Sequence, residues 1–152
     1  MALIDPELKA FLESDVAVLV GTRDAQLVGE VTPGWGPRPV DEHEVELFVD
    51  REAAKKTLEN IKDNRLLAVT CTSPITYESV QLKGWCVATS DPTSADHEWV
   101  AKHRDAFGAS ARARGMPTYA SRTMWSRDIV KLRLLVQDRF DQTPGPNAGR
   151  RV

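Results

Sequence analysis

The chain has 152 residues, a net charge of −2 and two cysteines, and 41% of its residues are hydrophobic. That length suits one domain, residues 1–152, whose core needs no disulfide or metal. General nucleic-acid binding calls for a basic excess, which is missing here. The longest apolar run, Val16 to Val20, is far too short to span a bilayer, and no secretion signal begins the chain. We therefore expect a cytoplasmic protein that binds neither nucleic acid nor membranes.

The first segment, residues 1–14, predicts a short helix. Asp5 is a plausible N-cap and Pro6 suits the first helical turn. The β-branched, apolar residues 16–20 then predict a buried strand. A polar turn follows, and residues 27–32 predict a second strand that pairs with the first as a hairpin.

Residues 33–39 contain three prolines and two glycines. Regular ladder pairing fails in such a stretch, so we expect a loop or a heavily bulged strand. Residues 45–49 predict a third strand with Val45, Leu47 and Val49 on one apolar face. A helix over residues 51–63 should follow, with Asp50 as a plausible N-cap.

Two further strands are predicted over residues 66–72 and 77–89, with a short loop between them. Cys71 and Cys86 lie in these apolar strands, so we expect two buried thiols. The alternation of the second strand separates two faces. The inward face comprises Val80, Leu82, Gly84, Cys86 and Ala88, and the outward face comprises Tyr77, Ser79, Gln81, Lys83 and Trp85.

The last part of the chain predicts helices and one strand. A helix begins at Thr93 or Ser94 and ends at Gly115, which Met116 and a proline follow. A short helix over residues 119–124, a strand over residues 128–136 and a polar tail over residues 140–152 complete the chain.

The order of these elements indicates the fold class. Most connections between successive strands are too short for parallel crossovers, so the strands must pair antiparallel. Six such strands favour closure into a barrel, because closure removes exposed edges. We expect a mainly β protein with helices, built on a six-stranded antiparallel barrel.

Several short motifs follow one another in a characteristic order. They are Thr22-Arg23-Asp24, Phe48-Val49-Asp50 leading to Lys55-Lys56, Asn64-Arg65-Leu66, Tyr77-Glu78 and Lys83-Gly84. This pattern resembles the FMN-binding split-barrel proteins related to pyridoxamine 5'-phosphate oxidase. The tail from Gln142 to Gly149 is similar to that of an uncharacterised branch of the same family.

The resemblance implies a homodimer that binds FMN in a cleft at the dimer interface. It assigns the FMN phosphate to Lys55 and Lys56, where helix N-termini and ammonium groups favour anions. The corresponding stretch of the oxidase is Ser-Arg-Lys, whereas Ala54 precedes the two lysines here. Asp50 stands where the family often has a phosphate-binding threonine. The alternative is therefore that the lysines are a solvated helix face and Asp50 is only a cap.

Two segments are candidates for holding the rest of the cofactor. On the outward face of residues 77–89, the resemblance places a cofactor contact near Ser79, and Gln81 is a second candidate. Between Thr32 and Arg38, backbone amides could bond the flavin edge, Trp35 could cover the ring, and Arg38 could bind a phosphate or an acidic substrate. The alternatives are a solvated strand face and a Trp35 that only packs against a neighbour.

These observations lead to a flavin-dependent oxidoreductase that acts on an unknown small-molecule substrate, with no catalytic residue identified. The alternative is a non-catalytic sensor or carrier that binds flavin weakly, or binds haem or another ligand. A purely structural interaction protein is a third possibility. His97-Glu98 and His103 do not form a His-Glu-x-x-His motif, so we expect no metal site.

Overall fold

The computed structural model describes residues 2–117 and 125–152. Its elements in chain order are α1 (Pro6–Leu12), β1 (Ala17–Arg23), β2 (Gly29–Pro39), β3 (Glu44–Asp50), α2 (Lys55–Asn64), β4 (Leu66–Thr72), β5 (Ser79–Ser90), α3 (Ser94–Ala113), β6 (Ile129–Asp141) and β7 (Arg150–Arg151). The predicted short helix over residues 119–124 lies outside the described residues. None of the described helices is long and apolar enough to cross a membrane.

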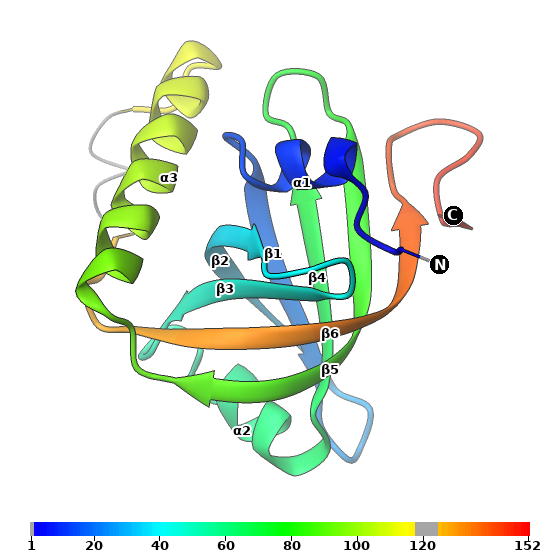
Figure 1. The fold of residues 1–152 in the computed structure, drawn as a ribbon, viewed down its shortest axis with the longest axis vertical. Helices are drawn as coiled ribbons and strands as arrows, with labels where there is room; N and C mark the ends of the chain where they lie inside the picture. Colours follow the sequence, from blue (N-terminus) through cyan, green and yellow to red (C-terminus); the bar gives the residue numbers. More distant parts are fainter. Residues whose placement is uncertain (1, 118–124) are drawn as a thin grey trace.

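The strands form one antiparallel sheet that closes on itself (Figure 1). Its order is β3-β2-β1-β4-β5-β6-β7, and a further pairing of β3 with β6 joins the first six strands into a barrel. The long strand β6 bends enough to pair with β5, β3 and β7. The predicted fold class, a six-stranded antiparallel split barrel with helices, is confirmed.

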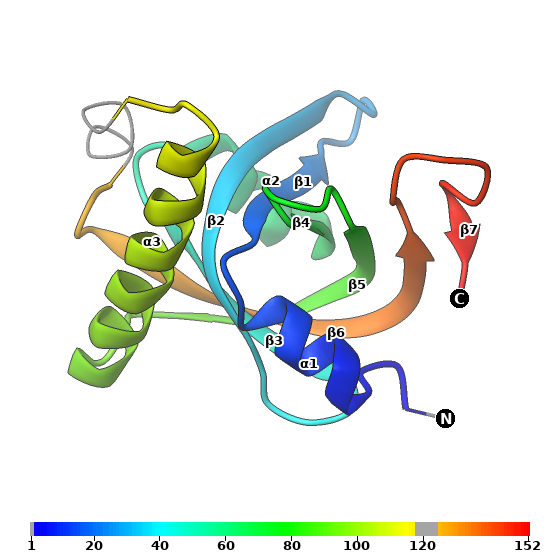
Figure 2. The same ribbon diagram turned by 90° about the horizontal axis from the view of Figure 1, so that it is seen from above.

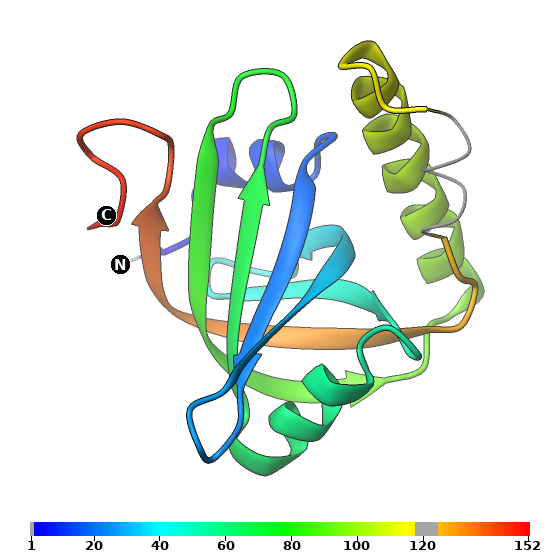
Figure 3. The ribbon, with the colours of Figure 1, turned by 180° about the vertical axis from the view of Figure 1, so that it is seen from behind.

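Apolar side chains from β1, β3, β4, β5 and β6 fill the interior, and two helices close its ends. Leu8 and Leu12 of α1 pack on this core from one end, while Ala54 and Ile61 approach from the α2 end (Figures 1 and 3). The predicted Asp5 cap is confirmed, since its Oδ1 accepts the Leu8 N–H at 2.7 Å. The ends of the barrel are therefore sealed within the chain.

A second core lies outside the barrel, beneath α3 (Figure 2). Its buried members are Trp35, Phe48, Val100, Phe107, Ala111 and Ile129. Thr93, one of the two predicted caps, forms a reciprocal capping box with Asp96 at the start of α3. Because of α3, both faces of β3 are buried, and the expectation of one apolar face was incomplete.

Residues 33–39 decide between two predicted alternatives, whereas the predicted start of α2 and the predicted end of β6 were wrong for identifiable reasons. Residues 33–39 belong to β2, and a register shift between Trp35 and Arg38 absorbs their irregularity, which is the bulged alternative. The helix α2 begins at Lys55 because Asp50 Oδ1 accepts the backbone N–H groups of Glu52 and Ala53 and holds residues 51–54 in turns. The strand β6 continues to Asp141, since β5 pairs with it that far.

Candidate functional site

An open groove of about 540 Å³ lies on the outer face of the sheet, across β2, β1, β4 and β5. Figure 3 shows these strands side by side and uncovered by any helix along most of their length. That volume is in the range of pockets that hold small ligands and cofactors. The groove is lined chiefly by apolar and small residues, among them Gly21, Gly29, Val31, Ala68 and Trp85.

Three glycines line the groove, and two of them, Gly21 and Gly29, leave bare backbone on its floor. A Cβ atom on Gly21 would meet nothing closer than the Ala68 carbonyl oxygen at 3.8 Å, and one on Gly29 would meet only the Thr22 oxygen at 4.0 Å. Neither glycine is needed to avoid a clash, so each simply leaves space. Gly21 interrupts an apolar strand, and such glycines often mark a close approach of a ligand or another backbone. A glycine within an apolar strand is therefore the sequence signal that points to this groove.

The rim of the groove combines apolar and charged side chains. Arg23 and Lys83 supply positive charge, and Glu30 and Asp138 supply negative charge. Trp85 is 45% exposed at the edge of the groove. These groups offer a flat apolar surface with ionic partners around it.

Exposed apolar residues continue from the groove along the same outer face. Val31 is 62% exposed and pairs across the strands with Gly21. Leu19 is 50% exposed and lies two residues from Gly21 on β1, so its side chain points to the same side. These side chains widen the apolar surface beside the groove.

The predicted residues Ser79 and Gln81 lie on β5 in line with Lys83 and Trp85. Gln81 is half-buried, and its Nε2 donates to Thr70 Oγ1 at 3.0 Å. Ser79 is buried, because its hydroxyl pairs with that of Thr72 at 2.8 Å and its backbone holds the C-terminal tail. The Gln142 side chain also donates to Gln81 Oε1 at 3.4 Å, so both Gln81 and Ser79 are engaged in internal contacts, and neither lines the groove.

The predicted residues Thr32 and Trp35 are both buried. Thr32 pairs with Val20 and points into the barrel, where its hydroxyl has no hydrogen-bond partner among the described residues. Trp35 is 3% exposed and packs edge-on against Phe107, while the Arg104 guanidinium lies 4.7 Å from its ring centre. In the structure, Trp35 packs against its neighbours and is not exposed where it could cover a flavin ring.

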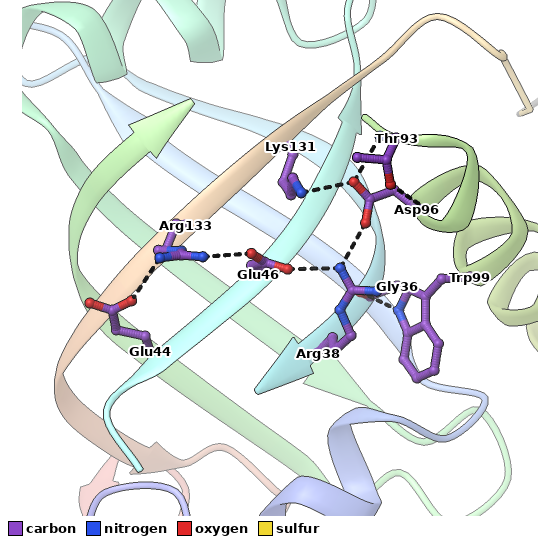
Figure 4. Close-up of polar contacts among 9 residues, drawn as sticks. All are labelled: Gly36, Arg38, Glu44, Glu46, Thr93, Asp96, Trp99, Lys131 and Arg133. Carbon is purple, nitrogen blue, oxygen red and sulfur yellow. Dashed lines mark hydrogen bonds and ion pairs between the residues drawn. The ribbon is translucent and has the colours of Figure 1, made fainter. Parts of the chain in front are cut away.

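The predicted residue Arg38 belongs to a chain of ion pairs that ties α3 to the barrel (Figure 4). Its Nη2 lies 2.7 Å from Glu46 Oε2 and 2.8 Å from Asp96 Oδ1. Two further cations extend this series of ion pairs. Lys131 Nζ lies 2.8 Å from Asp96 Oδ2, and Arg133 Nη2 lies 2.8 Å from Glu46 Oε1. Arg38 is therefore committed to partners within the chain.

Hydrogen bonds within this network control the ionisation of Asp96. Burial alone would raise the pKa of its carboxyl. The ammonium group of Lys131, the backbone N–H of Thr93 and the Arg38 guanidinium outweigh burial and hold that pKa far below its usual range. The network is consequently fully charged at neutral pH and acts as a clamp on α3.

The predicted phosphate ligands Lys55 and Lys56 lie on the exposed first turn of α2. Lys56 Nζ is 3.8 Å from Glu59, and neither lysine lines the groove of its own chain. The Asp50 carboxylate already accepts the Glu52 and Ala53 N–H groups at 3.1 and 3.2 Å. The structure does not bring these lysines together with Gln81, Trp35 or Arg38.

The two thiols are buried, as expected, and neither forms a disulfide. Burial raises the pKa of the Cys71 thiol to about 12 and also raises that of Cys86. Thiols of this kind stay protonated and unreactive at neutral pH. Neither cysteine is therefore a candidate nucleophile.

Comparison with known proteins relates the chain to others by structure alone. No family model matches the sequence, and no curated protein matches it. HupZ of Group A Streptococcus is similar over 97% of this chain and 100% of its own, with a TM-score of 0.57 and 19% identity. An F420 reductase is similar over 86% of this chain and 94% of its own, with a TM-score of 0.56 and 18% identity.

A third similar structure is that of an FMN-binding protein. It is a pyridoxamine 5'-phosphate oxidase-related, FMN-binding protein from Nostoc punctiforme, with a TM-score of 0.53 and 15% identity. The similarity covers 97% of this chain and 87% of the other. At these identities, the comparisons establish the fold, and the resemblance seen in the sequence motifs agrees with it. The chain therefore has the split-barrel fold of the pyridoxamine 5'-phosphate oxidase-related, FMN-binding proteins.

Proposed function

We propose that this protein binds FMN in the groove on the outer face of the barrel and acts as a flavin-dependent oxidoreductase on a small substrate. The observation that supports this most is the bare floor at Gly21 and Gly29, on a fold shared with FMN-binding proteins. A planar ring can lie directly on backbone there, because no side chain intervenes.

The residues present fit the chemistry of FMN. Trp85 offers an aromatic surface, while Arg23 and Lys83 offer positive charge for a phosphate. The bound flavin would supply the hydride-accepting ring, and the chain would orient it and shield it from water.

We further propose that the protein is a homodimer and that the partner subunit covers the open side of the groove. The exposed apolar residues Leu19, Val31 and Trp85 favour this arrangement, since a two-fold contact would remove them from water. The groove is open to solvent in one protomer, and a second copy would complete it.

The first test is an absorbance spectrum of the purified protein after FMN is added and the excess is removed by gel filtration. Retained flavin absorbance that elutes at the mass of a dimer supports the proposal. Oxidation of reduced nicotinamide by the loaded protein would then extend it to catalysis. A colourless protein that elutes as a monomer would rule out the proposal.

The phosphate has two competing assignments, the groove residues Arg23 and Lys83 and the lysines Lys55 and Lys56 that the sequence resemblance implies, and a separate test distinguishes them. Under the prediction for Lys55 and Lys56, their joint reversal to glutamate weakens FMN retention but leaves riboflavin retention unchanged, because riboflavin has no phosphate. Equal retention of FMN by the double variant and the unaltered protein would exclude these lysines. Thermal unfolding of both proteins controls for folding.

A non-catalytic carrier or sensor remains the second candidate, and one observation favours it. The Asp50 carboxylate occupies the backbone amides of Glu52 and Ala53, so an incoming phosphate would meet a negative charge instead of free donors. Equal, weak affinity for FMN and riboflavin would support this candidate, and a Soret band after haem is added would point to haem.

A further inference from the structure

A second cavity lies at the α2 end of the barrel, between α2 and the last part of β5. Its volume is about 510 Å³, which is enough for a small organic molecule. The Cys86 N–H donates to the Arg65 carbonyl at 2.7 Å and fixes one end of the crevice. The helix α2 and the last part of β5 lie together at the lower end of the barrel in Figures 1 and 3.

The floor of this crevice is apolar. Ile61, Cys86 and Val130 are each 5% exposed or less, and Leu58 is half-buried beside them. The Cys86 thiol adds no charge, because burial raises its pKa. The floor therefore suits a hydrocarbon or aromatic group.

The rim of the crevice is basic. Arg51, Lys62 and Arg65 line it, and none of the described residues that line it is acidic. Arg51 is held by Asp91 and Asp128 at 3.1 and 3.0 Å. Lys62 and Arg65 are exposed, and neither forms an ion pair with any other described residue. Two cations thus stand free above an apolar floor.

Two irregularities of the backbone shape the crevice. The β5–β6 register shifts between Cys86 and Ala88, so Ala88 is exposed instead of inward as predicted, beside Val87, which is 46% exposed. Arg65 ends α2 with a φ of 61°, a left-handed conformation in which glycine is the residue of lowest cost. The helix therefore carries an arginine where glycine would fold more easily.

We propose that this crevice is a binding site for a small carboxylate with an apolar body. Its apolar part lies on Ile61, Cys86 and Val130, and Lys62 and Arg65 bind its carboxylate. A guanidinium pairs with a carboxylate through two parallel hydrogen bonds, which explains why arginine stands at a position that favours glycine. The site is separate from the groove on the outer face and does not depend on flavin binding.

Naphthalene-2-carboxylate is a suitable probe, and isothermal titration calorimetry measures its affinity. Arg65→Gly should weaken binding about tenfold, as expected for the loss of one charged contact. The same variant should unfold at an unchanged or higher temperature, because glycine relieves the left-handed conformation. Lys62→Ala should also weaken binding. Arg65→Gly with unaltered affinity would overturn the proposal.

Leu27→Gly is the matched control. Leu27 has a φ of 65° and is 74% exposed, but it does not line the crevice. This variant should keep full affinity for the probe. Amide NMR shifts of the unaltered protein locate the ligand without any variant: the proposal expects them at Ala88 and Thr89. Shifts confined to Val31 and Trp85, or displacement of the probe by FMN, would overturn it.

Discussion

Two outer faces of the barrel wall differ in what covers them. Beneath α3, Trp35 and Phe48 are completed into a core by the helix, and the ion pairs of Asp96 fasten that helix in place. Across β2, β1, β4 and β5, no helix covers the wall, and apolar residues remain in contact with water. Both faces carry apolar side chains, but only the second provides space.

The difference teaches which aromatic and basic residues are available to a ligand. A tryptophan and an arginine in a glycine-rich stretch resemble ligand contacts in the sequence, yet Trp35 and Arg38 complete the packing under α3. Trp85 and Lys83, on the uncovered face, have no such commitment to a buried core. The covered face is therefore structural, and the uncovered face is the candidate site.

The largest expected effect is a loss of stability when the core beneath α3 is disrupted. Trp35→Ala should lower the free energy of unfolding by about 3–5 kcal/mol, because it leaves a cavity between β2 and α3. Urea unfolding measures this loss, and Trp35→Phe should lose less. FMN retention by the folded fraction should persist. Loss of flavin without loss of stability would show that Trp35 contacts the cofactor and would break the comparison.

The next effect concerns the clamp. Asp96→Asn should cost about 2 kcal/mol at neutral pH, because Arg38 and Lys131 lose their shared carboxylate but are partly exposed to water. The carboxyl has a lowered pKa, so its contribution is present above pH 3.8 and is lost as the pH falls below that value.

The acid dependence provides the control for the clamp. Urea unfolding between pH 7 and pH 3 should show a shallower decline for Asp96→Asn than for the unaltered protein. Asp91→Asn removes an exposed partner of Arg51 and should change stability little. Equal acid dependence of Asp96→Asn and the unaltered protein would contradict the role given to Asp96.

A smaller effect is expected at His103, which joins three segments on the covered face. Its Nδ1 accepts the Gly36 N–H at 2.8 Å, so the neutral ring donates from Nε2 to the Val16 carbonyl at 2.9 Å. Burial lowers the pKa of this histidine, and the charge of Arg104 lowers it further. As the pH falls below 6.5, this histidine is protonated in the unfolded chain but still neutral in the folded protein. The free energy of unfolding should therefore decline as the pH falls below 6.5.

The variant His103→Gln tests this account. It should lose about 1 kcal/mol at pH 7.5, because glutamine cannot make both hydrogen bonds from that position. The stability difference between pH 7.5 and pH 5.5 should shrink in the variant. An undiminished pH dependence would assign the titration to another group.

Much of the fold was predictable from local patterns. The strand over residues 66–72, the Asp5 cap and the Thr93 cap depend on neighbouring residues alone, and the structure has them. Residues 33–39 were harder, because their pairing depends on β1 and β3, which accept the bulge. The late start of α2 depends on a single side chain, Asp50, folding back onto the turn.

The candidate site was predictable only in part. Alternation placed Gln81, Lys83 and Trp85 correctly on one face of β5. The burial of Trp35 and the ion pair of Arg38 with Asp96 depend on α3, which is more than 50 residues away in the sequence, so no local pattern predicts them. Gly21 and Gly29 have no side chain, and only the packed sheet shows that the space beside them is empty.

The most direct test of the uncovered face is FMN retention by Gly21→Leu, compared with Gly21→Ala. The leucine side chain has room to fill the groove, and stability should stay within about 0.5 kcal/mol because no internal clash results. We expect Gly21→Leu to lose FMN, whereas Gly21→Ala keeps most of it. Full FMN retention by a folded Gly21→Leu would contradict the placement of the flavin in this groove.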